Sequence, residues 1–137
     1  MAGPHVWLKE KIEDATSVTA WPVGMTGTEG PPFAIYAREA TSREQVLADV
    51  LDSTPETDAI PPVARFLVGV YADDYVDAWA LADQITAAIH KWSGTENETT
   101  VDSCMVLDER DGQPDYLPGR ETPTYTVELS VEIRWIE

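Results

Sequence analysis

The sequence predicts an α+β fold, in which a mainly antiparallel sheet of about four strands carries two helices packed on one face. Three observations lead to this expectation. Residues 125–135 alternate strictly between apolar and polar side chains, as in a half-buried antiparallel strand. Residues 74–92 carry apolar side chains at helical spacing. Repeated β-α units are absent, so we do not expect a doubly wound parallel sheet.

The N-terminal part predicts a helix followed by strands. Pro4 suits the start of a helix because its missing N–H is not needed there, and apolar residues recur at helical spacing as far as Ala15. We therefore expect a helix at about 4–16. Residues 17–23 are rich in β-forming side chains, and the glycines and prolines at 24–32 indicate a loop. Residues 32–38 (PFAIYAR) then predict a strand.

Residues at about 40–61 predict a variable arm or loop whose conformation the sequence leaves open. Ser42 and Gln45 fit a capping box, and four apolar residues between 46 and 51 fit one helical face. The same residues also fit the arm of a β-hairpin. A polar tip at 53–58 and the Pro61-Pro62 pair end the segment in either case.

The central part predicts a strand that leads into the longest helix. Residues 63–72 include few polar side chains, which favours a central position in the sheet. Asp73 and Asp74 are candidate N-caps, and Asp77 favours the first helical turn electrostatically. We expect the helix at about 74–92, with Gly94 as its stop.

Two further strands follow in the C-terminal part. Residues 101–108 predict one strand, and residues 108–115 predict a loop with Asp111-Gly112 as its turn. The alternating residues 125–135 form the last strand. The length of the chain predicts one domain that spans residues 1–137.

Composition excludes several classes of function. The 137 residues include 9 Lys and Arg against 25 Asp and Glu, which gives a net charge of −16. This excess of acid argues against a protein that grips phosphates or docks on an anionic membrane, because both need basic side chains. No apolar run approaches the roughly 18 residues of a membrane span. A secretory signal is not evident, and the single cysteine, Cys104, predicts a reducing compartment.

Few residues are candidates for catalysis. His5 and His90 are the two histidines, and Cys104 with His90 is the one conceivable thiol pair. A histidine near a helix end and a small cysteine in a strand are ordinary structural features. Acids at 73–77 are more often a cap than a cation site. We therefore expect no catalytic, metal or cofactor-binding residues and no enzyme activity.

Four segments carry a resemblance to a known family. They are PFAIY at 32–36, RFLVGVYADDY at 65–75, the apolar positions of the helix at 78–85, and the alternating strand at 125–135. In this order they resemble the tail-completion, or tail-terminator, proteins of long-tailed bacteriophages over nearly the whole chain. These segments are features of a fold rather than of a catalytic site. Residues 40–61 and 108–121 have no counterpart in the resemblance.

The resemblance implies a structural virion protein that forms a ring, commonly of six subunits. Such a ring caps the head-proximal end of the tail tube and joins it to the head connector. The implied partners are further copies of this chain, the tail tube protein, and the connector or head-closure protein. DNA would pass through the centre without specific binding, and no membrane contact is expected. The implied location is the neck of the virion, and the host cytoplasm during assembly.

Charge suggests which residues serve such a ring. An acidic lumen would let DNA phosphates slide past rather than adhere. The candidates to face the lumen are the acids of the arm, Glu44, Asp49, Asp52, Glu56 and Asp58. Basic residues could pair with acids across an interface, although an ordinary solvated charge is the alternative for each. The candidates for a subunit or partner interface are Arg38, Arg43, Arg65, Trp92, Arg110 and Arg120.

Two other functions stay open. One is a different neck component, such as a head-closure protein, whose ring would be a small β-barrel without the long helix, so the helix at 74–92 favours a terminator. The other is a small acidic protein-binding module, for instance a mimic of nucleic acid. That module would be monomeric, with its acids in a convex band rather than around a pore.

Overall fold

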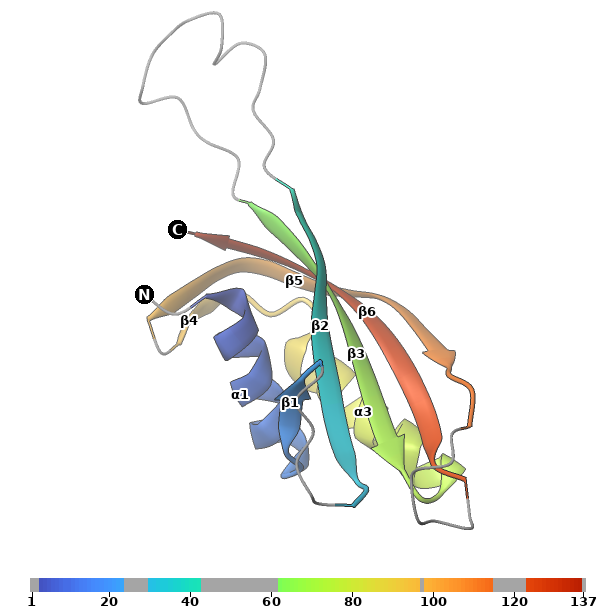
Figure 1. Cartoon of the computed structure of the whole chain (residues 1–137). Helices are drawn as coiled ribbons and strands as arrows, with labels where there is room; N and C mark the ends of the chain where they lie inside the picture. The colour runs from blue at the N-terminus through green and yellow to red at the C-terminus, as the bar shows by residue number, and fades with distance from the viewer. Residues whose placement is uncertain (1–2, 24–29, 43–61, 97, 115–122, 137) are drawn as a thin grey trace, which may run out of the picture.

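The computed structural model describes residues 3–23, 30–42, 62–96, 98–114 and 123–136. Within them, two helices and six strands form an α+β fold, and Figure 1 shows a strongly twisted sheet with the helices beside it. The elements in chain order are α1 (Pro4–Thr16), β1 (Ala20–Pro22), β2 (Phe33–Ser42), β3 (Val63–Ala72), α3 (Tyr75–Ile89), β4 (Gly94–Glu96), β5 (Thr99–Asp111) and β6 (Tyr125–Ile136).

The sheet has the strand order β1-β2-β3-β6-β5-β4. Four of its five strand pairs are antiparallel, and β1 with β2 is the parallel one, so the expectation of a mainly antiparallel sheet is confirmed. The expected number of about four strands matches the four long strands, which are β2, β3, β5 and β6. The additional strands, β1 and β4, are three residues each and lie at the two edges of the sheet.

The core lies between one face of the sheet and the two helices. In β6 every second residue from Val127 to Trp135 is buried, which confirms the predicted half-buried strand. The same face receives Trp7, Leu8 and Ile12 of α1 and four buried residues of α3. Fully burying a side chain of the size of Leu or Ile contributes roughly 1.5–3 kcal/mol, so this shared layer is the main source of stability.

The long helix starts where the sequence predicts and ends three residues earlier. The Asp74 side chain accepts a hydrogen bond from the Val76 N–H at 2.9 Å, so Asp74 is the N-cap. After Ile89 the chain leaves the helix because it pairs with β5: Lys91 N–H donates to Cys104 O at 2.7 Å, and Cys104 N–H donates to Trp92 O at 3.1 Å. Sheet pairing, rather than a glycine stop, therefore ends α3.

Gly94 begins strand β4 instead of stopping the helix. Its φ of +145° is a conformation that side chains rarely adopt, and a Cβ there would lie 3.2 Å from the Trp92 ring. Glycine thus lets the chain turn from the helix end into β4.

Strand β5 is longer than expected and extends into the predicted 108–115 loop as far as Asp111. Its polar end pairs with β6 from Asp108↔Ser130 to Asp111↔Val127, after bulges near Val101 and Val106. Side-chain partners stabilise this polar end. Thr86 Oγ1 donates to the Glu109 carboxylate at 2.7 Å, for example. A run of polar residues predicts a loop, but this one is a strand because its side chains have hydrogen-bond partners.

The predicted arm begins later than expected. Strand β2 continues through Ser42, which pairs with Val63 at the end of the β2–β3 ladder. Residues 43–61 lie outside the described residues, so the choice between a helix and a hairpin arm stays open there.

The cap of α3 yields a testable prediction. Replacing Asp74 by Ala removes the acceptor for the Val76 N–H, and we expect the free energy of unfolding to fall by about 1 kcal/mol. Asp83→Ala is the matched control, since Asp83 is an exposed acid within the same helix, and its effect should stay within about 0.5 kcal/mol. Urea unfolding followed by circular dichroism measures both variants. Equal losses would show that the cap has no special role.

Candidate assembly surfaces

The sheet face turned away from the helices is a candidate assembly surface, which we call the outer sheet face. It consists of the residues that alternate with the buried ones in β2, β3, β6 and β5. No helix or strand of the described residues covers it. On the β2–β3 side it is apolar: the rings of Phe33 and Tyr71 stack with centroids 4.9 Å apart, beside Ile35 and Leu67.

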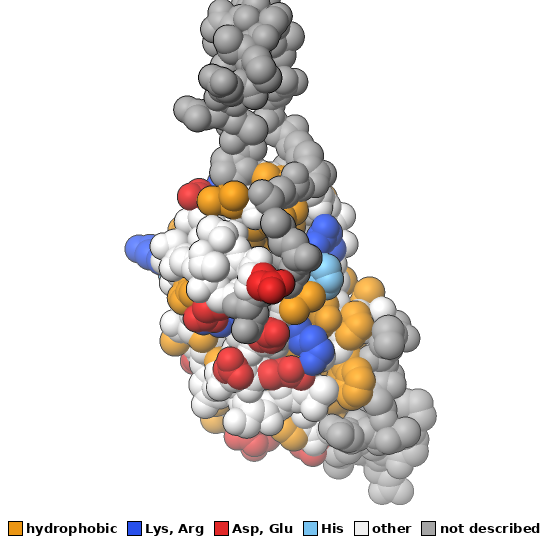
Figure 2. All heavy atoms as spheres, turned by 90° about the vertical axis from the view of Figure 1, so that its left-hand side faces the viewer, with side chains coloured by type: hydrophobic (Ala, Val, Ile, Leu, Met, Phe, Trp, Pro, Cys, Tyr) orange, Lys and Arg blue, Asp and Glu red, His pale blue; other side chains and the backbone are white. Residues whose placement is uncertain are grey.

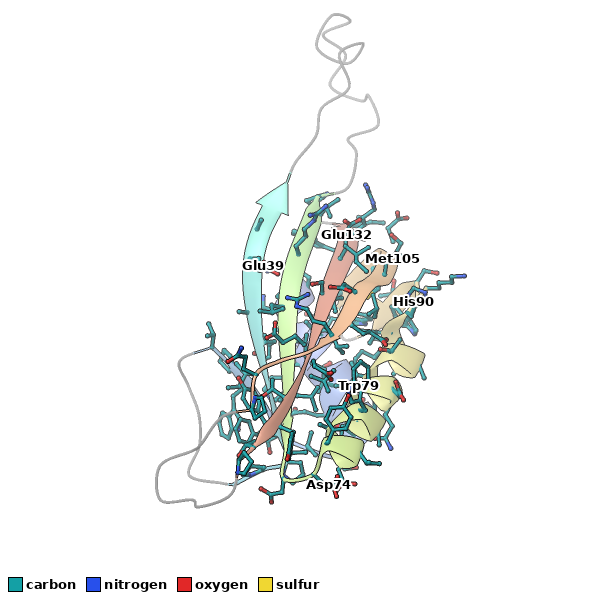
Figure 3. All side chains as sticks on the ribbon, turned by 90° about the vertical axis from the view of Figure 1, so that its right-hand side faces the viewer. Glu39, Asp74, Trp79, His90, Met105 and Glu132 are labelled. Atoms are coloured by element: carbon teal, nitrogen blue, oxygen red, sulfur yellow. The ribbon has the colours of Figure 1, made fainter. Side chains whose placement is uncertain are left out.

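The β6–β5 side of the outer sheet face is charged and internally paired. Arg110 donates to Asp108 at 2.8 Å and reaches Glu128 at 3.1 Å, and its hydrogen bond to Asp108 raises the pKa of the guanidinium. Arg65 lies 3.5 Å from Glu132. Figure 3 shows Glu132 beside Met105 on the neighbouring strand. Arg65 and Arg110, both expected at an interface, thus already have partners within their own chain.

Arg38 lies at the other side of the molecule, on strand β2. Its guanidinium stands 5.4 Å from the centroid of the Phe66 ring and 5.7 Å from that of Trp135. It also lies 3.3 Å from His5 Nδ1 and 3.4 Å from Thr41 Oγ1. Arg38 therefore covers the edge of the core with its charged head at the surface.

Trp92 packs against α1 within the same chain. Its ring centroid is 5.1 Å from that of Trp7, and Lys11 Nζ lies 4.4 Å above the Trp92 ring. The ring is half-buried and borders the hydrophobic core. Its role at a subunit contact stays a prediction.

The remaining predicted residues lie outside the described part of the chain. They are Arg43, Arg120 and the five candidate lumen acids Glu44, Asp49, Asp52, Glu56 and Asp58. The placement of the candidate lumen acids therefore stays a prediction.

Exposed acids lie on both sides of the described part of the molecule. Asp74, Asp77 and Asp83 are exposed on or beside α3. On the outer sheet face, Arg65 and Arg110 pair with three carboxylates.

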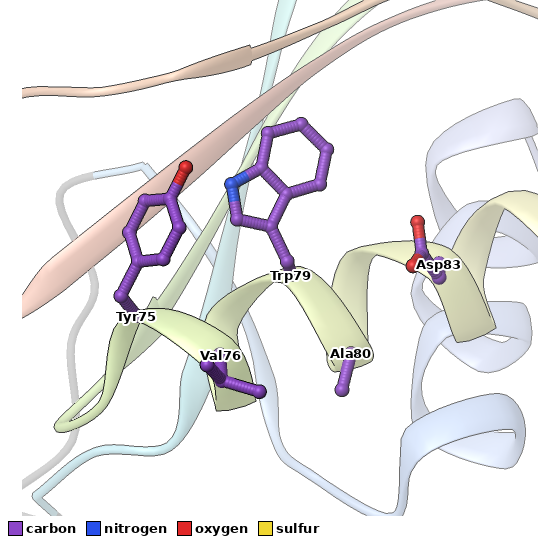
Figure 4. Close-up of a pocket in the computed structure, with 5 residues that line it drawn as sticks. All are labelled: Tyr75, Val76, Trp79, Ala80 and Asp83. Carbon is purple, nitrogen blue, oxygen red and sulfur yellow. The ribbon is translucent and has the colours of Figure 1, made fainter.

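Side chains of α3 hold the end of β5 by hydrogen bonds, which the sequence did not predict. The Asp111 carboxylate accepts from Tyr75 Oη at 3.1 Å and from Trp79 Nε1 at 2.7 Å. Tyr75 and Trp79 are four residues apart on the helix, and Figure 4 shows both aromatic rings on the same side, away from Val76 and Ala80. The spacing of two aromatic residues with polar tips was the available signal.

Cys104 and His90, the candidate thiol pair, both have structural environments. Cys104 is fully buried, and burial raises the pKa of its thiol to about 12. His90 Nδ1 accepts the Val106 N–H at 3.1 Å. In the described residues, no helix has the length and apolarity to cross a membrane, and no three His, Cys, Asp or Glu gather to hold a metal ion.

Two of the shallow hollows on the described surface are further candidates for contact sites. The first, shown in Figure 4, lies along α3 and is lined by Tyr75, Val76, Trp79, Ala80 and Asp83. The second lies beside the outer edge of β2, where α1, β1 and β2 meet. Both are open to solvent, as contact surfaces are, rather than enclosed like the pockets of most small-molecule sites.

Comparison with known proteins gives a structural likeness. No protein-family model and no curated protein sequence matches this chain. Among solved structures, a chain in the virion of a native gene transfer agent (GTA) particle superposes with a TM-score of 0.63 at 11% sequence identity. The match covers 93% of this chain and 90% of that chain. At this identity the likeness establishes a shared fold.

Burial of Cys104 yields a prediction about thiol reactivity. A pKa of about 12, instead of 9.0, leaves roughly a thousandfold less thiolate near neutral pH, and burial also blocks access. We expect iodoacetamide at pH 8 to leave the native protein unlabelled and to label it fully in urea. A Val23→Cys variant is the control, because Val23 is 66% exposed, and it should take up one label quickly. Equally fast labelling of the unsubstituted protein would contradict the prediction.

Proposed function

We propose that this protein is a structural virion protein that forms a ring, of six subunits, at the head-proximal end of a phage-like tail tube. The ring joins the tube to the head connector, and DNA passes through its centre. The observation that carries the proposal is the shared fold with a chain of a gene transfer agent virion, which extends over nine-tenths of both chains.

The surfaces of the fold are compatible with a head-to-tail ring, which needs two different complementary patches on each subunit. The short strands β1 and β4 cover only part of the sheet edges: β1 pairs with Ala34–Tyr36, and β4 pairs with Thr99–Val101. The outer edge of β2 from Ala37 to Ser42 has no described strand beside it, whereas Lys91 and Trp92 pair with Cys104 on the outer edge of β5. The two edges lie at opposite ends of the strand order, so they are different surfaces.

The charge of the protein supports passage of DNA rather than its capture. At −16 the chain repels a polyanion, and the arginines Arg65 and Arg110 are already paired with carboxylates. We propose that the lumen acids come from residues 43–61, which carry five carboxylates against one arginine.

Deletion of the gene in cells that produce the particle tests the proposal. We expect DNA-filled heads and separate tails, or tails of excessive length, in electron micrographs, because the joint and the stop for tube growth are both lost. Supplying the intact protein from a plasmid should restore joined particles. Normal joined particles without the protein would overturn the proposal.

Light scattering of the purified protein tests the ring itself. A ring of six has six times the 15.1 kDa mass of one chain. We expect this mass to appear as concentration rises, or when tube protein is added. A protein that stays monomeric up to millimolar concentration and also with tube protein would favour the acidic binding module instead.

A further inference from the structure

The hollow beside the outer edge of β2 has the properties of a peptide-docking groove. It has a volume of about 410 Å³ and combines residues of one helix and three strands. We call it the β2-edge groove, and it is lined by His5 of α1, Pro22 and Val23 at the end of β1, Tyr36, Ala37 and Arg38 of β2, and Phe66 of β3.

An open strand edge borders the groove. The Val23 N–H donates to Tyr36 O at 2.9 Å, and this is the last described hydrogen bond between the β1 segment and β2. From Ala37 to Ser42, strand β2 pairs with β3 on one side, and no described strand lies on the other. Such an edge offers unpaired backbone donors and acceptors that an extended segment can complete.

The groove has an apolar floor and a basic rim. Val23 is 66% exposed at one wall, and the buried Phe66 ring lies below Arg38. None of the ion pairs among the described residues includes Arg38, whose guanidinium contacts His5 and Thr41 instead. Figure 2 shows orange hydrophobic side chains beside blue basic ones and a histidine on this side of the molecule. The groove therefore suits a segment that is both apolar and acidic.

We propose that the β2-edge groove binds residues 43–61 of a neighbouring copy of this chain. This segment carries five carboxylates against one arginine, Arg43, and the apolar residues Val46, Leu47, Val50 and Leu51. Its negative charge complements Arg38 at the rim, and its apolar residues match the floor. The inference rests on the proposed function, because a ring supplies the neighbouring copy.

Strands β2 and β3 fix where the segment leaves and re-enters the sheet. Ser42 and Val63 are paired, so the chain leaves and re-enters the sheet at one end, where Figure 1 shows both strands ending side by side. The groove lies beside Tyr36–Arg38, at an earlier point along β2 than Ser42. A hairpin made from these 19 residues would reach about 30 Å, at about 3.3 Å per residue and half the residues in each arm. That distance is enough to lie across an adjacent subunit.

Disulfide trapping tests the docking directly. Full-length Val23→Cys chains are mixed with full-length Leu47→Cys chains, so that a bond between the two new cysteines can only join different copies. The buried Cys104 contributes little background. We expect a disulfide-linked dimer under mild oxidation, with Val46, Val50 and Leu51 as alternative positions for the cysteine. Dilution of a Val23→Cys, Leu47→Cys double variant into excess unsubstituted protein should abolish its crosslinks.

Two outcomes would overturn the inference while the proposed function stands. One is a complete ring, by light scattering, that gives no crosslink at any of the four positions. The other is a crosslink within single chains that survives the dilution, which would show that the segment covers its own groove. A protein that never forms a ring would instead contradict the proposed function.

A charge substitution in the groove provides an independent measurement. Val23→Asp places a carboxylate in the apolar wall, and Arg38→Glu reverses the rim, so both should raise the concentration for half-assembly on the order of tenfold or more. Gln84→Glu is the control, because Gln84 is exposed within α3, lines neither hollow, and is replaced by an acid of similar helix propensity. We expect no shift for the control. Equal shifts for Val23→Asp and Gln84→Glu would contradict the groove as the docking site.

Discussion

Trp7, Leu8 and Ile12 of α1 press against the same sheet face as the buried residues of α3, and this one-sided packing constrains the rest of the molecule. The alternation in β3 and β6 follows from it, because one face of each strand meets the helices and the other does not. A sheet covered on one face must leave the second face to solvent or to a partner. The edges, the outer sheet face and the β2-edge groove are all consequences of that asymmetry.

Elements with local signals were predictable from sequence. Pro4 marks the start of α1, Asp74 caps α3, and the alternation of β6 predicts its buried face. Elements that depend on distant partners were not. The helix α3 ends where Lys91 and Trp92 pair with Cys104. Strand β4 consists of Gly-Thr-Glu, so no apolar residue predicts it. The polar end of β5 is a strand because of tertiary contacts that no local pattern encodes.

The candidate site shows the same division. Basic residues could be named from sequence, but the partners of Arg65 and Arg110 lie on other strands and appear only after the strands are in register. The β2-edge groove is lined by residues of a helix, a short strand and two long strands. No local sequence pattern therefore marks Val23 as part of a groove. The net charge, by contrast, could be used from composition alone, because repulsion of a polyanion depends on the sum of the charges and not on the order of residues.

The position of β6 in the sheet has a consequence for biosynthesis. It is the last strand in the chain, yet it lies between β3 and β5 and pairs with both. The strands made earlier therefore cannot form the complete sheet until residues 125–136 have left the ribosome, and until then two long inner edges lack their shared neighbour. A nascent chain of this protein cannot present its finished surfaces to other copies, so subunit association must follow the completion of translation through β6.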